Sequence, residues 1–448
     1  MNNYTRLLDP RTGEECGQAP IADEAQVNHA VTTAQQAFSN WRQSTAQERH
    51  DCLLALADEI NTHAEQIADA EALNTGKTPE QVLEAEIPSA INELRFMAGA
   101  LRAQTSPGAG EYVTGHFSYA LREPVGVCVL IAPWNYPFAM AVSKLAPALA
   151  MGNTVVLKPA ETTPLSAQLL VELCAKVLPA GVVNIVCGDR ETGRALVRHP
   201  LPALVSITGS TVAGKQVASD AAATLKRLHL ELGGKAPAMV FADADLELAA
   251  AGIAGSAFYN AGQDCTASCR VLVATSCYEH FVTLLLEQAK ACELDPLNSP
   301  EQLARVEGFV KRLPGHAKVL CGGQVRAGRG FFYEPTVIVD VQQNDEVVQE
   351  EIFGPVITVQ AFESEQQAVE LANAVPFGLA ASIWTRDLSR AQRLPGRIDA
   401  GTVWLNCHSV VAAEMPFGGV KGSGYGKDLS VLALDAYSRI KHVMSYAY

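Results

Sequence analysis

The sequence predicts an α/β protein with open parallel sheets, and two observations support that prediction. From about residue 154 onward, short apolar runs of strand length alternate with longer stretches whose apolar residues recur every three to four positions. Strands that alternate with helices in this way form parallel sheets covered by helices. The 448 residues, of which 48% are apolar and 18% charged, are enough for two or three domains with large cores.

The first hundred residues are predicted to be helical, because apolar residues recur there at three- and four-residue spacing. A Pro- and Gly-containing segment, 105–110, ends this part, and two strands joined by a short turn at Glu123-Pro124 follow it. The expected helices cover residues 25–41, 46–71, 78–102, 164–177 and 213–225. The expected strands cover residues 117–122, 125–131, 154–157, 183–187, 203–208, 238–240 and 270–274.

Charge and cysteine usage narrow the class of protein. The net charge of −14 argues against a broad phosphate-binding surface, so no nucleic-acid partner is expected. The longest apolar stretch, residues 125–132, is too short to cross a bilayer, and no signal peptide is recognisable. The 11 cysteines lack the spacing of a disulfide framework. Reduced thiols, a cytoplasmic location and no membrane partner are therefore expected.

Cys265 lies in a run of small and polar residues, 260–266, and is the first candidate for catalysis. A nucleophilic thiol needs access, a lowered pKa and an oxyanion donor nearby, and small neighbours leave backbone amides accessible. The competing interpretation is a buried structural cysteine, which the polar Gln263 and Asp264 weaken. Cys269 offers neither a second cysteine pair nor flanking histidines, so no metal site is expected.

Glu231 and Asn135 are the other two candidates for catalysis. Two leucines flank Glu231, which predicts partial desolvation and a raised pKa suited to a general base. A surface carboxylate at a strand end explains Glu231 equally well. Two prolines fix the backbone around Asn135, whose amide NH2 can stabilise an oxyanion. A rigid turn with a buried Trp134 is the better explanation of that segment taken alone.

Residues 207–216 place a glycine turn between an expected strand and an expected helix. They nearly match the phosphate loop G-x-x-x-x-G-K-[ST], but Gln216 lacks the hydroxyl that binds magnesium, which disfavours a nucleoside triphosphatase. The turn can still receive a pyrophosphate at the N-terminus of the helix. The fingerprint G-x-G-x-x-G is absent, so the sequence does not support the common Rossmann pattern.

These segments, in this order, resemble the aldehyde dehydrogenase superfamily over nearly the whole chain. Further matching segments are KPAE at 158–161, EEIFGP at 350–355 and PFGGVKGSG at 416–424. GQDCT at 262–266, EMP at 414–416 and YGKD at 425–428 look most like the bacterial gamma-aminobutyraldehyde dehydrogenases. The resemblance implies two open parallel-sheet Rossmann-type domains plus a small β oligomerisation element.

The resemblance also implies domain boundaries. Residues 1–114 and 128–232 are expected to bind a dinucleotide, and residues 233–424 to form the catalytic domain. Residues 115–127 and 433–448 are expected to form an oligomerisation hairpin and tail, giving a homodimer or homotetramer. The end of that tail, Ser445 to Tyr448, is expected to add a strand to a neighbouring chain. The family's strand pair that precedes the Asp9-Pro10 region is expected to be largely missing.

Roles follow from the resemblance residue by residue. Cys265 looks like the nucleophile, Asn135 with the Cys265 amide like the oxyanion hole, and Glu231 like the base that activates the deacylating water. The implied reaction adds the thiolate to an aldehyde, transfers hydride from the adduct to a nicotinamide, and hydrolyses the resulting thioester to an acid. The implied cofactor contacts are Trp134, Lys158, Glu161, Gly209, Ser210, Leu232, Glu351 and Phe353.

The choice of cofactor and substrate is also predicted. Glu161 at the adenosine ribose would repel a 2′-phosphate, so NAD is expected over NADP. The leading substrate is a small aminoaldehyde such as 4-aminobutanal, and an aliphatic, aromatic or semialdehyde substrate is the alternative. Ser143 stands where aminoaldehyde relatives often carry a tryptophan, which can hold an ammonium group. The expected substrate pocket is Tyr136, Asp264, Thr266 and Phe417, with Glu93 and Glu414 as further acidic candidates.

Two functions of other classes remain open from the residues themselves. Cys265 and Glu231 alone would permit a thiol esterase that needs no cofactor. A catalytically inactive scaffold is disfavoured, because Cys265, Glu231 and Asn135 are all intact.

Overall fold

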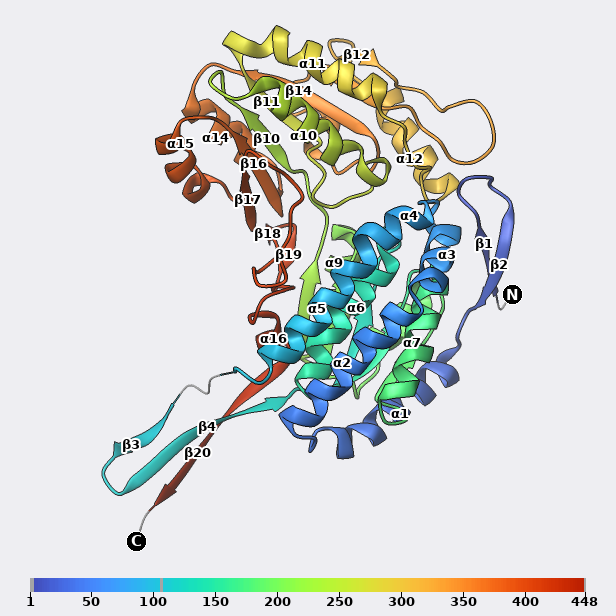
Figure 1. The fold of residues 1–448 in the computed structure, drawn as a ribbon, viewed down its shortest axis with the longest axis vertical. Helices are drawn as coiled ribbons and strands as arrows, with labels where there is room; N and C mark the ends of the chain where they lie inside the picture. The colour runs from blue at the N-terminus through green and yellow to red at the C-terminus, as the bar shows by residue number, and fades with distance from the viewer. Residues whose placement is uncertain (1–3, 105–107, 447–448) are drawn as a thin grey trace.

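Two open sheets, each covered by helices, make up most of the chain, which the computed structural model describes over residues 4–104 and 108–446 (Figure 1). Within these residues no helix is long and apolar enough to cross a membrane. The prediction of an α/β fold with open parallel sheets is confirmed.

The first sheet has six strands in the order β19-β9-β8-β5-β6-β7. All are parallel except β19, which is antiparallel to β9. From β5 the chain adds strands on one side and then returns to add β8 and β9 on the other, so the strand order reverses between β5 and β8. Ligands of open α/β sheets bind at the carboxyl ends of the strands at such a reversal. The bounds are β5 (Val127–Ile131), β6 (Thr154–Lys158), β7 (Val183–Ile185), β8 (Leu204–Thr208), β9 (Arg227–Glu231) and β19 (Gly424–Tyr425).

Helices bury both faces of this sheet, because successive side chains of a strand point to opposite faces. Cys128 and Leu130 belong to the core on the side of α2, α5, α6 and α7, whereas Val127 and Val129 pack on the side of α1, α8 and α9. The bounds are α1 (Glu24–Trp41), α2 (Ala46–Thr62), α5 (Ile87–Ala100), α6 (Pro137–Ala150), α7 (Leu165–Val177), α8 (Arg190–Arg198) and α9 (Thr211–Ala222).

Two of the expected helices are interrupted. The helix expected over residues 46–71 divides at His63, whose backbone (φ −107°, ψ 21°) is not helical, into α2 and α3 (Ala64–Thr75). The helix expected over residues 78–102 consists of α4 (Pro79–Gln81), a π-helical turn at Val82–Glu86, and α5. Apolar spacing continues across both breaks, so spacing alone could not locate them.

The second sheet has seven strands in the order β12-β13-β14-β11-β10-β16-β17, and only β12 is antiparallel to its neighbour. The strand bounds are β10 (Pro237–Val240), β11 (Arg270–Ala274), β12 (Lys318–Cys321), β13 (Thr336–Val339), β14 (Val356–Phe362), β16 (Ala380–Trp384) and β17 (Thr402–Leu405). The helix bounds are α10 (Leu246–Phe258), α11 (Tyr278–Ala291), α12 (Pro300–Lys311), α13 (Glu346–Gln349), α14 (Glu365–Asn373) and α15 (Leu388–Arg393). A two-stranded pair, β15 (Phe377–Gly378) with β18 (Val420–Lys421), lies apart from this sheet.

A three-stranded antiparallel sheet forms an arm that extends away from both bodies (Figure 1). Its strands are β3 (Ala109–Val113), β4 (His116–Pro124) and β20 (Ser438–Tyr446), which follows the short helix α16 (Ala433–Ala436). The hairpin is therefore formed by β3 and β4, and the expected boundary at residue 127 is wrong. Val127 begins the fully buried β5, which lies between β6 and β8.

The tail and the N-terminus each form part of an antiparallel sheet. Residues 445 and 446 pair with β4 of the same chain in β20, which lies at the edge of its sheet, while residues 447 and 448 lie outside the described residues. One described strand, β1 (Tyr4–Leu8), precedes Asp9-Pro10, and it pairs around that turn with β2 (Glu15–Pro20) in an antiparallel sheet. Half of the expected break at 105–110, namely 105–107, is likewise outside the described residues.

Candidate active site

Every residue that the sequence assigns to catalysis, cofactor or substrate lines one cavity of about 1220 Å³. Its lining comes from the segments that follow β5, β6, β8 and β9 and from those that precede β11 and β14. The strand-order reversal of the first sheet and the body of the second sheet therefore share one space. Of the further acidic candidates, Glu93 lines the same cavity, whereas Glu414 is not part of the lining.

Asn135 follows β5, and hydrogen bonds hold both its side chain and its backbone carbonyl. Its Nδ2 donates to the carbonyl oxygen of Gln263 over 2.9 Å, and its own carbonyl accepts from Lys77 Nζ over 2.6 Å. Asn260 Nδ2 donates to the same carbonyl over 3.2 Å. An amide NH2 carries two hydrogens, so Asn135 retains one for an acceptor within the cavity.

Cys265 follows α10 through a strained turn. Asn260 and Ala261 have positive φ angles of 49° and 53°, a region that residues other than glycine rarely adopt. Strain of this kind is often found at functional sites. Gln263 fixes the turn, since its Nε2 donates to the Asn260 carbonyl over 3.0 Å and its Oε1 accepts from the Asn298 amide over 2.8 Å.

The Cys265 thiol is less acidic than a free cysteine. Burial raises its pKa well above the usual value, and the nearby carboxylates of Asp264, Glu351 and Glu231 raise it further. A lowered pKa is therefore not built into the resting site. The thiol must lose its proton to a base or beside a positive charge that arrives with a ligand.

Glu231 ends β9 and is almost fully buried, at 3% exposure. Burial is the main cause that raises the pKa of its carboxyl group to about 7, and the charge of Asp428 acts in the same direction. Among the described residues neither of its oxygens has a hydrogen-bond partner. A buried carboxyl with a pKa near neutrality can accept a proton and release it again during turnover.

Aromatic and acidic side chains lie close together in another part of the cavity lining. Tyr136 Oη donates to Asp264 Oδ2 over 2.8 Å, and the Thr266 amide and hydroxyl both donate to Asp264 Oδ1 over 2.7 Å. Glu93 is buried and accepts from Ser143 Oγ over 3.0 Å. Burial raises the pKa of Glu93 to about 8, so its carboxyl group is mostly protonated at neutral pH.

Polar and aromatic residues are also part of the lining. Lys158 Nζ lies 3.9 Å from Glu161 Oε2, and half of the Glu161 side chain is exposed. Ser210 caps α9, where its hydroxyl accepts from the Ala213 amide over 3.2 Å. The rings of Trp134 and Phe353 meet edge to face with centroids 5.2 Å apart.

Two groups near the site were missed by the sequence analysis. Lys77 is buried, donates to Glu86 Oε1 over 2.5 Å as well as to Asn135, and its Nζ lies 4.1 Å from the centre of the Tyr136 ring. No local sequence signal marks Lys77. His229 lies two residues before Glu231 on the same strand, and this spacing could have identified it, because residues i and i+2 share one face.

Comparison with known proteins identifies the class. The family model described as "Aldehyde dehydrogenase family" matches residues 2–443. The chain belongs to the aldehyde dehydrogenase family.

Individual relatives match over almost their whole lengths. A betaine aldehyde dehydrogenase of Brucella melitensis is 39% identical over 455 residues, covering 98% of this chain and 93% of that protein. The solved structure of an aldehyde dehydrogenase from Bacillus cereus in complex with NAD+ has a TM-score of 0.97 and 36% identity, covering 99% of this chain and 94% of the other. A betaine aldehyde dehydrogenase from Staphylococcus aureus in complex with NAD+ also has a TM-score of 0.97, with 34% identity, covering 99% and 92% respectively.

Proposed function

We propose that this enzyme oxidises a small aminoaldehyde, such as 4-aminobutanal, to the corresponding acid with NAD, through an acyl intermediate on Cys265. The observation that carries this proposal is the single cavity that contains the Cys265 thiol, the Glu231 carboxyl group, the Asn135 amide and a set of acidic side chains.

The lining residues fit a dinucleotide. The N-terminus of the 12-residue α9, with Gly209 and Ser210, favours an anion such as a pyrophosphate. The half-exposed Glu161 offers acceptors for ribose hydroxyls and would repel a 2′-phosphate, which supports NAD over NADP. The structural relatives from Bacillus cereus and Staphylococcus aureus are complexes with NAD+. When bound, NAD supplies the hydride acceptor that the oxidation of an aldehyde requires.

The protein's own groups account for the remaining chemistry. Glu231 accepts the proton of the Cys265 thiol, a ligand-borne positive charge would stabilise the thiolate that results, and the thiolate adds to the aldehyde carbon. The free N–H of Asn135 and the Cys265 amide stabilise the oxyanion that forms. After oxidation to the thioester, Glu231 takes a proton from water, the water oxygen bonds to the acyl carbon, and Cys265 leaves as the thiolate.

The acidic side chains support an amino group on the substrate. Asp264 and Glu93 line the cavity with Cys265. A cation would pair with the Asp264 carboxylate, and its positive charge would favour loss of the proton from Glu93. Ser143 leaves open the space that an aromatic residue would fill and presents Glu93 instead. Relatives named betaine aldehyde dehydrogenases act, by their names, on a cationic aldehyde. A semialdehyde carries the opposite charge and is disfavoured by the same residues.

A panel of aldehydes tests the substrate class. We expect 4-aminobutanal and 3-aminopropanal to give a higher kcat/KM than hexanal, benzaldehyde or succinic semialdehyde, with NADH absorbance as the signal. The variant Glu93→Gln should lower kcat/KM for 4-aminobutanal about tenfold and leave that for hexanal nearly unchanged. Aminoaldehydes that rank last would overturn the proposed substrate class and leave only aldehyde oxidation.

The variant Glu231→Gln tests the role of the base, because the amide cannot accept a proton. We expect an initial burst of NADH close to one equivalent per active site, followed by a stalled steady state. Full turnover by this variant would refute the assigned role, and product release without NAD would instead favour the thiol esterase.

We also propose that each of the two large sheets belongs to a part of the chain with its own function. The parallel strands of the first sheet all fall between residues 127 and 231, which supports a dinucleotide-binding part over 1–114 and 128–232. The strands of the second sheet fall between residues 237 and 405, which supports a catalytic part over 233–424. The 11 cysteines are free, which agrees with a reducing cytoplasmic location.

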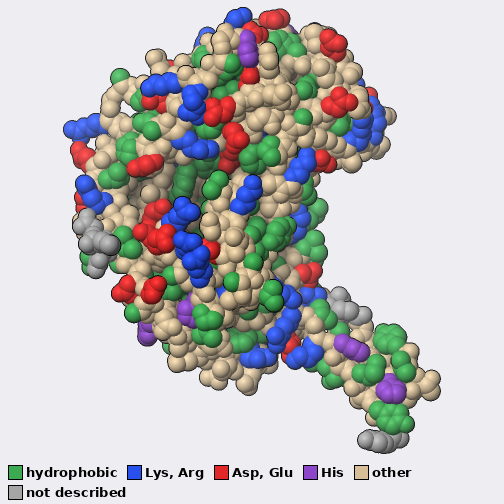
Figure 2. Space-filling model, turned by 180° about the vertical axis from the view of Figure 1, so that it is seen from behind, with side chains coloured by type: hydrophobic (Ala, Val, Ile, Leu, Met, Phe, Trp, Pro, Cys, Tyr) green, Lys and Arg blue, Asp and Glu red, His purple; other side chains and the backbone are tan. Residues whose placement is uncertain are grey.

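We further propose that the arm joins subunits in a homodimer or homotetramer. Figure 2 shows hydrophobic side chains gathered on it, and Tyr112, Phe117, Leu121, Ile440 and Met444 are among its exposed apolar residues. An exposed strand edge with apolar side chains favours pairing with another chain. Light scattering should give a mass of two or four chains, and Ile440→Asp should lower it.

A further inference from the structure

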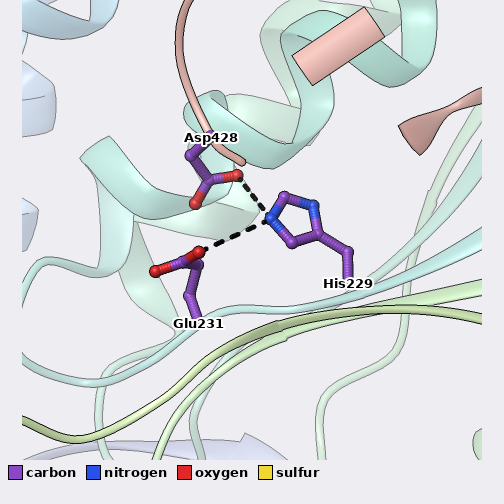
Figure 3. Close-up of side chains that lie close together, drawn as sticks. All are labelled: His229, Glu231 and Asp428. Carbon is purple, nitrogen blue, oxygen red and sulfur yellow. Dashed lines mark ion pairs between the residues drawn. The ribbon is translucent and has the colours of Figure 1, made fainter. Parts of the chain in front are cut away.

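Behind Glu231 lie two buried polar side chains that the proposed mechanism does not use. His229 shares a face of β9 with Glu231, and Asp428 follows β19, which pairs with β9. His229 Nε2 lies 3.8 Å from Glu231 Oε1 and 3.4 Å from Asp428 Oδ1, so both carboxyl groups point toward the same ring nitrogen (Figure 3). The three residues are 0%, 3% and 4% exposed in the order His229, Glu231, Asp428.

These groups are unsatisfied as they stand. Over the described part of the chain, neither nitrogen of His229, neither oxygen of Glu231 and not Oδ1 of Asp428 has a hydrogen-bond partner. A neutral imidazole has one donor and one acceptor nitrogen. A buried donor and acceptor this close to two carboxyl groups can gain hydrogen bonds by shifts of about 1 Å, since an N–H···O bond spans about 2.9 Å.

Two glycines pack closely against this group. A Cβ atom at Gly418 would lie 2.5 Å from Glu231 Oε1, and one at Gly426, where φ is 104°, would lie 2.3 Å from His229 Cδ2. The glycine segment thus closes directly over the group. Glu231 and Asp428 line the cavity, whereas His229 does not, so His229 bridges two groups that both face the substrate space.

Other ionisable groups surround the three residues. Lys144 Nζ lies 3.8 Å from Asp428 Oδ2 and donates to Ser206 Oγ over 3.2 Å. The Tyr437 ring lies 6.1 Å from the His229 ring, and the charge of Asp428 contributes to the raised pKa of Glu93. Lys144 thus lies beside Oδ2 of Asp428, whereas His229 lies beside Oδ1.

We propose that His229 carries the proton from Glu231 to Asp428 during deacylation, so that Glu231 is ready for the next turnover. Water loses one proton to Glu231 as its oxygen bonds to the acyl carbon and the carbon–sulfur bond breaks. Nε2 of neutral His229 accepts that proton from Glu231 and then donates it to the Asp428 carboxylate, which releases it to water in the cavity. His229 is a positioning and relay residue, since it does not touch the substrate, and its role rests on the proposed function of Glu231.

The variant His229→Gln tests the relay, because an amide can form hydrogen bonds but cannot carry a proton at neutral pH. We expect an unchanged burst of NADH, a steady-state rate at least about tenfold lower, and a larger solvent deuterium isotope effect on that rate. Asp428→Asn should show the same burst, the same lowered steady-state rate and the same larger isotope effect as His229→Gln. In an assay without cofactor, both should retain the burst of 4-nitrophenolate from 4-nitrophenyl acetate and slow the release of acetate.

Chemical rescue separates a relay from a structural role. His229→Ala opens space beside Glu231, and added imidazole should restore at least half of the lost rate, with imidazole-dependent saturation. His280→Gln, an exposed histidine on α11, serves as the matched control and should match the parent enzyme. If His229→Gln does not fold, Asp428→Asn provides the same kinetic test.

The outcomes distinguish the two proposals. Wild-type steady-state rates and isotope effects in both His229→Gln and Asp428→Asn, together with a stalled Glu231→Gln, would overturn the relay and leave the role of Glu231 intact. A freely turning over Glu231→Gln would overturn both. A slow His229→Ala that imidazole does not accelerate at any pH would show a structural role only.

Discussion

The buried Lys77–Glu86 pair beneath Asn135 gives the sharpest prediction about how the oxyanion site is held. Replacing Lys77 by Met removes three interactions: the 2.5 Å contact with Glu86, the 2.6 Å hydrogen bond to the Asn135 carbonyl and the cation–π contact with Tyr136. Lys77 and Glu86 are 1% and 4% exposed, so the variant leaves a buried carboxylate without its cation. Removing one partner of a buried pair costs about 3–5 kcal/mol.

The double variant Lys77→Met with Glu86→Leu separates stability from catalysis. Because both charges are removed, the free energy of unfolding should return to within about 1 kcal/mol of the parent. The Asn135 carbonyl would still lack its charged donor and keep only Asn260, so kcat/KM should remain roughly tenfold below the parent. The single variant Lys77→Met should lose both stability and kcat/KM.

Urea unfolding followed by Trp fluorescence and steady-state NADH formation measure the two quantities. A double variant as unstable as the single one would refute the reasoning about the buried charge. A double variant with parental kcat/KM would show that Lys77 does not position Asn135.

Three further predictions concern other parts of the site. Asn135→Ala should lower kcat about 100-fold or more with a smaller effect on KM, since one oxyanion donor is worth about 3 kcal/mol; a tenfold loss or less would exclude this role. Folded Glu93 binds its proton up to about pH 8 but releases it near 4.5 when unfolded, so stability should fall as pH rises between these values. Glu93→Gln should lessen that fall in the free energy of unfolding by about 1.4 kcal/mol per pH unit, as measured by urea unfolding at several pH values. Parallel plots of unfolding free energy against pH for the variant and the parent would contradict the raised pKa. Glu161→Ser should raise kcat/KM with NADP at least about tenfold relative to NAD, whereas an unchanged ratio would place the ribose contact elsewhere.

Local sequence pattern predicted much of the fold because many elements are determined by short-range spacing. The strand expected at 270–274 coincides with β11, and the helix expected at 164–177 differs from α7 by one residue. Pairing was harder to predict. The segments at 117–122 and 125–131 are both strands, but the first joins the arm and the second lies between β6 and β8, because burial on both faces, rather than proximity in sequence, selects the partner.

The sequence by itself determined the chemical groups available for catalysis: a thiol at Cys265, a carboxyl group flanked by leucines at Glu231, and an amide between prolines at Asn135. Only the tertiary structure decided the pKa values of these groups and which other side chains lie beside them. Burial together with Asp264 and Glu351 raises the pKa of Cys265, and the pairing of β19 with β9 brings Asp428 to His229. The physical reason is that pKa values and hydrogen bonds depend on distances and burial in space, which spacing along the chain does not determine.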